Sequence, residues 1–140
     1  KDVFVDTNAA KNLVTPMTEH FKQFYLWLYK DGVLVFSNHL RREYFQGNQN
    51  LVALIDYLLK NGRLNNIPNN KIADYKFAKH IERDFLSNYK DRVHLKLVAL
   101  SSRKIAISSD TNFATDISNL PKLDGKKAIC VDCPSKINYR

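Results

Sequence analysis

Short apolar runs alternate along the chain with segments whose apolar residues recur at helical spacing. Unbroken runs at residues 3–5 and 32–37 are typical of strands that are buried on both faces. Similar runs predict strands at residues 104–108 and 128–131, and Ile67 indicates a short edge strand. Strands of this kind belong to parallel sheets that are covered by helices.

Between these runs, apolar positions three and four residues apart predict amphipathic helices. The expected helices cover residues 9–13, 17–30, 38–44, 51–59, 72–85, 93–100 and 111–119. Pro16 and Gly47 mark the ends of two of them, and Met17 marks the start of another. Residues 63–70, which include Pro68 and several Asn residues, are predicted to form a loop.

The alternation of strands and helices predicts an α/β fold. We expect residues 1–140 to form a single domain with three α/β/α layers around a central, mainly parallel sheet of four to five strands. The crossovers between strands should be right-handed. A chain of this length is long enough to bury a substantial core.

The charge of the chain indicates a polyanionic partner. There are 22 basic and 14 acidic residues, which gives a net charge of +8 and favours nucleic acid over a membrane surface, although simple solubility also explains such an excess. The longest apolar run, residues 24–29, is too short to span a bilayer, and residues 1–2 do not open a signal sequence. Two cysteines do not make a disulfide framework, so we expect a cytoplasmic protein.

Four acidic residues are placed where parallel strands end. Asp6 and Asp110 directly follow apolar strands, Glu43 lies in the helix after the second strand, and Asp91 begins the helix before residues 104–108. Carboxyl ends of parallel strands meet at one edge of a sheet, so these side chains should face one crevice. Asp6 also suits a helix cap, and this alternative remains open.

No Lys or Arg is placed at these strand ends to neutralise the acids. We therefore expect the carboxylates to raise one another's pKa and to bind a divalent cation. A ligand set made only of oxygen atoms selects Mg²⁺ or Mn²⁺.

Four fragments carry this pattern in a fixed order. They are Val3-Phe-Val-Asp6-Thr7-Asn8, residues 37–43, Asp91-Arg-Val-His94-Leu95 and residues 107–113. Together they resemble the opening strand with Asp-x-Asn, the Ser-helix-Glu element, the Asp-x-x-His-Leu helix start and the Thr-x-Asp-x-Asp-Phe segment of PIN domains. PIN domains are a family of metal-dependent nucleases, and the resemblance extends over essentially the whole chain.

The resemblance implies a metal-dependent endoribonuclease that hydrolyses RNA phosphodiester bonds. Asp6, Glu43, Asp91 and Asp110 would bind one or two Mg²⁺ or Mn²⁺ ions and carry catalysis. Asn8, Asn112 and His94 would support them, and Asn112 stands where many members have another Asp, so a second metal would bind more weakly. Many small bacterial members are toxins that an antitoxin protein silences. An antitoxin partner and a homodimer both remain open for this chain, as does the choice between RNA and DNA.

Basic residues flank the predicted acids. Arg41, Arg42, Lys90, Arg92 and, less directly, Lys11 are candidates for contacts with the phosphate backbone. A solvated helix face explains the same residues equally well.

Other interpretations stay open. A catalytically inactive RNA-binding module on the same fold is one, and a phosphotransfer enzyme of the haloacid-dehalogenase kind is another, although the latter needs an Asp where Asn8 stands. His94 either bonds Asp91 or packs, and Asp116 is expected to be a surface acid. Cys130 and Cys133 have redox spacing but are expected to be ordinary thiols because a strand end, rather than a helix start, carries them.

Overall fold

The computed structural model describes residues 2–15, 18–46 and 48–140, and these form an α/β domain built on a parallel sheet. The strands are β1 (Asp2–Val5), β2 (Val33–Phe36), β3 (Leu64–Asn66), β4 (Ile105–Ile107) and β5 (Ile129–Val131). Their order is β3-β2-β1-β4-β5, and every neighbouring pair is parallel. The predicted fold class is therefore confirmed.

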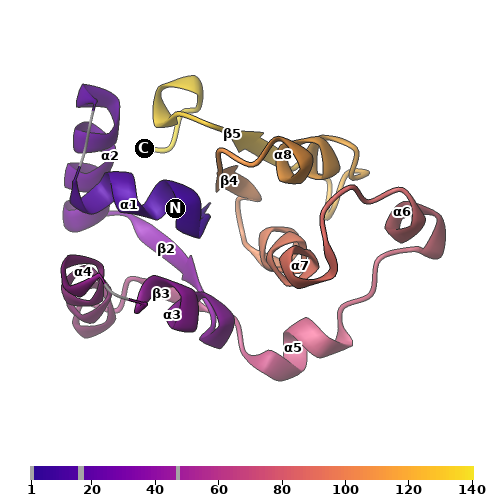
Figure 1. Ribbon diagram of the computed structural model, residues 1–140, viewed down its shortest axis with the longest axis horizontal. Helices are drawn as coiled ribbons and strands as arrows, with labels where there is room; N and C mark the ends of the chain where they lie inside the picture. Colours follow the sequence, from indigo (N-terminus) through magenta and orange to yellow (C-terminus); the bar gives the residue numbers. More distant parts are fainter. Residues whose placement is uncertain (1, 16–17, 47) are drawn as a thin grey trace.

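Helices cover the sheet on both faces. They are α1 (Thr7–Val14), α2 (Glu19–Lys30), α3 (Asn38–Tyr44), α4 (Gln49–Lys60), α5 (Asn69–Asp74), α6 (Lys79–Arg83), α7 (Arg92–Leu100) and α8 (Thr111–Ser118), with short 3₁₀ helices η1 (Tyr89–Asp91) and η2 (Pro134–Lys136). Figure 1 shows α1–α4 on one side of the sheet and α5–α8 on the other. The three predicted layers are present.

The apolar pattern explains the central elements. Every residue of β1 is buried, as expected for a strand that lies between two helical layers. The predicted helix at residues 17–30 is α2, whose apolar face buries Phe21, Phe24 and Leu28. The Thr18 hydroxyl accepts a hydrogen bond from the backbone N–H of Phe21 and caps the helix. Pro16, Met17 and Gly47, at which the sequence predicts helix ends or starts, lie outside the described residues.

The helix predicted over residues 72–85 is wrong. Two short helices, α5 and α6, replace it, and Tyr75 between them has an extended backbone. The aromatic residues of this segment pack edge-to-face on one another, with ring centroids 5.1 Å apart for Tyr75 and Phe77 and 5.2 Å apart for Phe77 and Phe85. These contacts bury the apolar residues without a continuous helix, so helical spacing alone misled the prediction.

The loop predicted over residues 63–70 is only partly correct. It contains the edge strand β3, which ends one residue before Ile67, and the start of α5. Phe36 of β2 is in register with Asn66, and the backbone N–H of Ile67 continues the pairing by donating to the Phe36 carbonyl. Of the Asn residues that suggest a loop, Asn65 and Asn66 therefore lie at the carboxyl end of β3, and Asn69 and Asn70 begin α5.

The strand order creates a crevice in the middle of the sheet. The chain moves outward from β1 to β2 and β3, then returns to the other side of β1 with β4 and β5. The turn-around point of such a sheet leaves a crevice beyond the carboxyl ends of the two central strands, which here are β1 and β4. Asp6 and Asp110 follow these strands, so the fold places both at this crevice.

A buried carboxylate holds the segment that leads into η1. Asp116 on α8 is only 1% exposed, and it accepts hydrogen bonds of 2.8 Å from the backbone N–H groups of both Leu86 and Ser87. The expectation that Asp116 is a surface acid is wrong, because α8 turns this side chain inward to satisfy two backbone donors. This anchor fixes the chain just before Asp91.

We expect Asp116→Asn to destabilise the protein by about 1–3 kcal/mol, because the amide of Asn would face a backbone donor that the carboxylate now satisfies. Urea unfolding measures this loss, and amide hydrogen exchange at Leu86 and Ser87 should accelerate. The matched control, Asp56→Asn on the exposed face of α4, should change stability by no more than about 0.5 kcal/mol. Equal stability of the two variants would contradict the anchoring role.

Candidate metal centre

Three side chains from different elements converge beyond the carboxyl ends of the strands. Asp6 follows β1, Glu43 lies on α3 and His94 lies on α7. Each offers one ligand atom, and these atoms lie within 4.8 Å of one another. His94 is buried, whereas Asp6 and Glu43 are half-buried. Two carboxylates and an imidazole at this separation can hold a divalent metal ion.

Asp6 is oriented by three donors. Its Oδ1 accepts from the backbone N–H of Thr7 at 2.8 Å. Its Oδ2 accepts from the hydroxyl of Ser108 at 2.8 Å and from the amide of Asn8 at 3.3 Å. Asp6 is also the N-cap of α1. The cap and the site are therefore compatible roles, because the start of α1 faces the crevice.

Glu43 is held between two other residues of the site. Its Oε1 accepts from the hydroxyl of Thr7 at 2.8 Å, and its Oε2 lies 2.7 Å from Nε2 of His94. Burial acts to raise the pKa of Glu43, but the hydrogen bond and charge of His94 outweigh it and lower the pKa. Burial likewise acts to lower the pKa of His94, and the bond to Glu43 raises it. The two pKa shifts are in the directions that favour an ionised Glu43 paired with a protonated His94.

One expectation is wrong, because the imidazole of His94 faces the carboxylate of Glu43 and the pKa of Glu43 is lowered instead of raised. Of the two alternatives for His94, packing is confirmed, since its ring is buried and lies 5.5 Å from the ring of Phe4. Its hydrogen-bond partner is Glu43 instead of Asp91. The reason is tertiary, since α3 and α7 cover opposite faces of the sheet and meet only beyond its edge. Glu43 and His94 are 51 residues apart, and no local pattern links them.

Asp91 and Asp110 lie close to this group without belonging to it. The pKa of Asp91 is raised by burial and by the charges of Asp6, Asp110 and Glu43, with His94 opposing. Asp110 caps α8, because its Oδ1 accepts from the backbone N–H groups of Asn112 at 2.9 Å and Phe113 at 3.2 Å. The four predicted acids thus share one edge of the sheet, but only Asp6 and Glu43 join the compact ligand group.

Ser108 is a member of the site that the sequence did not reveal. Its hydroxyl donates to Asp6 and accepts from the backbone N–H of Asp110 at 3.1 Å, so it bridges the ends of β1 and β4. Asn8 supports the same contact, since its carbonyl oxygen accepts from the backbone N–H of Ser109 at 3.2 Å. Asn112 is exposed in the first turn of α8. The only hint of Ser108 was a polar residue directly after an apolar strand.

Two further residues lie behind the site. Tyr44 is fully buried, and its hydroxyl donates to the backbone carbonyl of Val5. Burial raises the pKa of Tyr44 well above the usual range, and the charges of Asp6 and Glu43 raise it further. Burial and the charge of Asp6 raise the pKa of the Cys130 thiol to about 12. Cys130 and Cys133 are free thiols, and a thiol with such a high pKa is a poor nucleophile.

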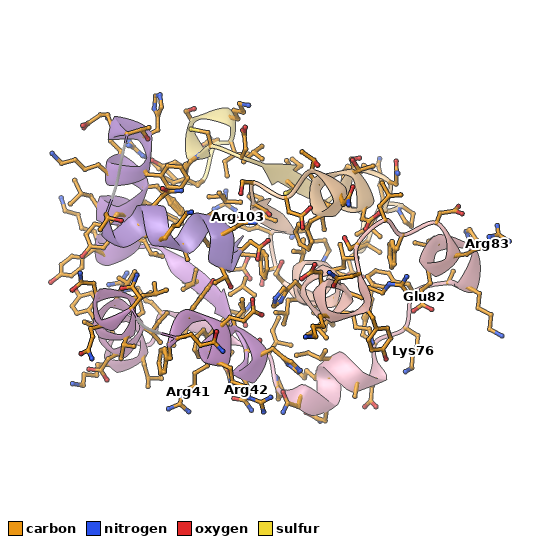
Figure 2. The ribbon with its side chains drawn as sticks, in the orientation of Figure 1. Arg41, Arg42, Lys76, Glu82, Arg83 and Arg103 are labelled. Atoms are coloured by element: carbon orange, nitrogen blue, oxygen red, sulfur yellow. The ribbon has the colours of Figure 1, made fainter. Side chains whose placement is uncertain are left out.

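The predicted basic residues have different surroundings. Figure 2 shows Arg41 and Arg42 reaching outward from α3, and Arg41 lies over the ring of Phe45 at 5.3 Å. Lys11 on α1 and Lys90 in η1 are exposed. Arg92 is half-buried with its guanidinium over the Phe85 ring at 5.7 Å, so it packs against the protein. Contacts of all five with phosphate remain predictions.

No protein-family model, curated protein or solved structure matches this chain. Within residues 2–15, 18–46 and 48–140, every helix is too short or too polar to cross a lipid bilayer. The interpretation of the site therefore depends on its own geometry and chemistry.

We expect Glu43→Gln to lower the pKa of His94, because burial remains while the charged partner is lost. NMR titration of the imidazole should show a midpoint above 6.5 in the wild type and a lower one in the variant. Because the folded-state pKa of His94 is raised, the stability from this pair is complete below about pH 6.5, the unfolded-state pKa, and is lost as the pH rises through the higher folded-state pKa. Glu19→Gln on the exposed face of α2 is the control and should leave the midpoint unchanged. The same midpoint in all three proteins would contradict the pairing.

Proposed function

We propose that this chain is a divalent-metal-dependent endoribonuclease that hydrolyses RNA phosphodiester bonds with Mg²⁺ or Mn²⁺. The observation that supports this most directly is the convergence of Asp6, Glu43 and His94 at the central crevice, within the field of two more acids. The resemblance to PIN domains supports hydrolysis of phosphodiester bonds as the reaction. The basic charge of the chain supports a polyanionic substrate such as RNA.

The donor set suits a divalent ion. Carboxylate oxygens suit both Mg²⁺ and Mn²⁺. Nε2 of His94 would join them as a ligand only in the neutral imidazole, after it leaves its hydrogen bond with Glu43. When bound, such an ion neutralises negative charge on the scissile phosphate and lowers the pKa of water.

Neighbouring residues hold the carboxylates of the site in position. Thr7, Asn8 and Ser108 fix the carboxylate of Asp6, and His94 fixes Oε2 of Glu43. The raised pKa of Asp91 makes its carboxylate a better proton acceptor at neutral pH than an ordinary aspartate. We therefore propose that Asp91 accepts a proton from attacking water, and that Asp6 and Glu43, whose ligand atoms converge, hold the cation.

The resemblance to PIN-domain toxins also supports a protein partner. We include an antitoxin as a proposed partner, and copurification with the product of an adjacent small reading frame tests it. Sedimentation of the purified chain tests the proposed homodimer.

We expect RNA cleavage to require Mn²⁺ or Mg²⁺ and to stop in EDTA. Changing Asp6, Asp91 or Asp110 singly to Asn should reduce the cleavage rate by at least about a hundredfold, the scale of losing one key electrostatic group. Asp6→Asn should also weaken Mn²⁺ binding in calorimetry, which does not depend on activity. Asp132→Asn, at an exposed site paired with Lys136, is the control and should retain full rate.

The other interpretations give different results in the same assays. An inactive RNA-binding module would bind RNA but cleave none in Mn²⁺. A phosphotransfer enzyme would release phosphate from a phosphomonoester and leave RNA intact. A phosphotransfer enzyme of this kind needs a carboxylic acid at the position of Asn8. Asn8 has an amide instead, and this amide donates a hydrogen bond to Asp6. Full cleavage in EDTA would end the metal-dependent proposal.

The exposed arginines of α3 generate a separate prediction. Replacing Arg41 and Arg42 together with Ala should weaken RNA binding for all sequences, and should flatten the slope of log affinity against log salt by about 1.4 for a single strand, because two fewer phosphates are neutralised. Fluorescence anisotropy at several salt concentrations measures this slope. Replacing Lys22 and Lys30 on α2 with Ala is the charge-matched control. An unchanged slope in the α3 variant would place RNA elsewhere.

A further inference from the structure

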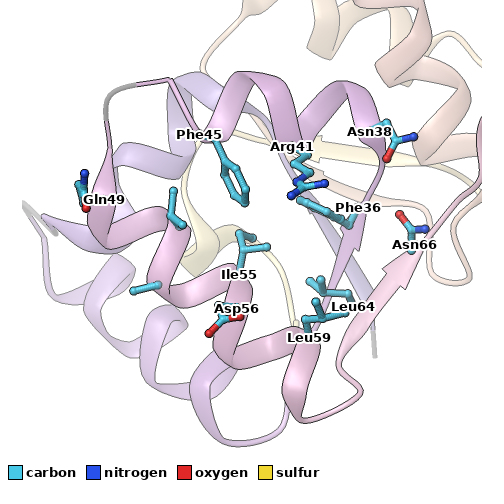
Figure 3. Close-up of a pocket in the computed structure, with 12 residues that line it drawn as sticks. Phe36, Asn38, Arg41, Phe45, Gln49, Ile55, Asp56, Leu59, Leu64 and Asn66 are labelled. Carbon is cyan, nitrogen blue, oxygen red and sulfur yellow. The ribbon is translucent and has the colours of Figure 1, made fainter.

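A second hollow adjoins the candidate metal centre on the far side of α3. It is an open pocket of about 670 Å³ between α3, α4 and the edge strand β3 (Figure 3). Its walls are mainly apolar and include Phe36, Phe45 and Leu59. Figure 3 shows Asn38 and Asn66 together at one end of this pocket, with Arg41 beside them. An apolar pocket of this size with a few convergent polar groups is typical of a small-ligand site.

The sheet relates this pocket to the metal centre. Asn38 follows β2 and Asn66 ends β3, and both strands run parallel to β1. Both amides therefore lie at the same edge of the sheet as Asp6. Along α3, Arg41 and Glu43 are about 200° apart, so they project from opposite faces of the helix. Helix α3 is thus a wall shared by the two sites, with its acid toward one and its arginine toward the other.

We propose that this pocket binds a nucleobase of single-stranded RNA, whose backbone crosses α3 on its way to the metal centre. The half-buried ring of Phe45 and the exposed side chain of Leu59 supply apolar surface of the kind on which unpaired bases pack, over a floor that includes the buried Phe36. Each carboxamide of Asn38 and Asn66 offers both donors and an acceptor, which suits the polar edge of a base. Arg41 carries the positive charge that a neighbouring phosphate requires.

The charges around the pocket agree with this occupant. Asp56 is the acidic residue of its lining, and Lys60 pairs with it at 3.0 Å, so its charge is compensated. Arg41 stacks on Phe45 without an acidic partner among the ion pairs of the described residues. The mouth of the pocket is therefore positive, which favours an anionic occupant such as a nucleotide over a basic segment of protein.

The base is expected to come from the RNA substrate, and in this respect the inference rests on the proposed function. Base binding itself needs no metal. It is therefore measured in EDTA, where failure of base binding and failure of cleavage are separate results.

The direct test is NMR of the ¹⁵N-labelled protein in EDTA. Adenosine, uridine, cytidine and guanosine monophosphates are added in turn, followed by RNA hexamers of each base, and ribose 5-phosphate serves as the probe without a base. We expect the side-chain amide signals of Asn38 and Asn66 to shift with nucleotides, by amounts that depend on the base. Hexamers should produce the same shifts at lower concentration, because the backbone adds contacts to Arg41.

A double variant tests recognition. Asn38→Ala with Asn66→Ala, both at exposed positions, should reduce the ratio of affinities between the best and worst hexamer by about tenfold, within the range lost with a specific base contact. The salt dependence should not change, since no phosphate contact is removed. Asn70→Ala, exposed on α5, is the matched control and should keep the wild-type ratio.

Three results would overturn the inference. Equal shifts with ribose 5-phosphate would show that the pocket recognises phosphate alone. Absence of shifts at both Asn residues with every nucleotide and hexamer would show that no base enters. Shifts at these residues that follow protein concentration, together with a dimer mass by light scattering, would show that a second copy of the chain occupies the pocket. Base-dependent shifts without RNA cleavage in Mn²⁺ would retain the pocket and remove only the ribonuclease proposal.

Discussion

The ion pair between Glu43 and His94 joins the two helical layers where no strand lies between them. Glu43 comes from α3 on one face of the sheet and His94 from α7 on the other, with 2.7 Å between the charged atoms. His94 is almost completely buried, and a buried charge is costly unless it is paired and hydrogen-bonded. The pair therefore sets the separation of α3 and α7 beyond the sheet edge. That separation in turn determines which ligand atoms meet at the crevice.

Two of the carboxylates at the crevice also stabilise the fold itself. Asp6 and Asp110 cap α1 and α8, and the partial positive charge at a helix start stabilises a carboxylate there. Ser108 connects the two caps through a single hydroxyl. Several acids can thus lie together at one edge of the sheet, because the helix starts and His94 supply positive charge that offsets part of their mutual repulsion.

The short helix α3 organises a larger surface than its seven residues suggest. Its inner face carries Glu43 and the buried hydroxyl of Tyr44, which bonds the backbone just before Asp6. Its outer face carries Arg41 toward the pocket beside β3. The parallel sheet brings both faces to the same edge, so one helix borders both the candidate metal centre and the neighbouring pocket.

The pattern of apolar and polar residues by itself predicted the α/β class and the strands β1, β2, β4 and β5, because buried parallel strands appear in a sequence as short apolar runs. The same pattern placed Asp6 and Asp110 at strand ends. The same reasoning wrongly predicted one continuous helix at residues 72–85, where two short helices and packed aromatic rings are found. It also wrongly predicted that Asp116 is on the surface, although its carboxylate accepts from two backbone N–H groups distant in the sequence. The partnership of Glu43 with His94 and the bridging hydroxyl of Ser108 were decided only by tertiary structure. These contacts join residues 51 and 102 positions apart, and such pairs leave no periodic trace in the sequence, because their geometry depends on how whole layers pack.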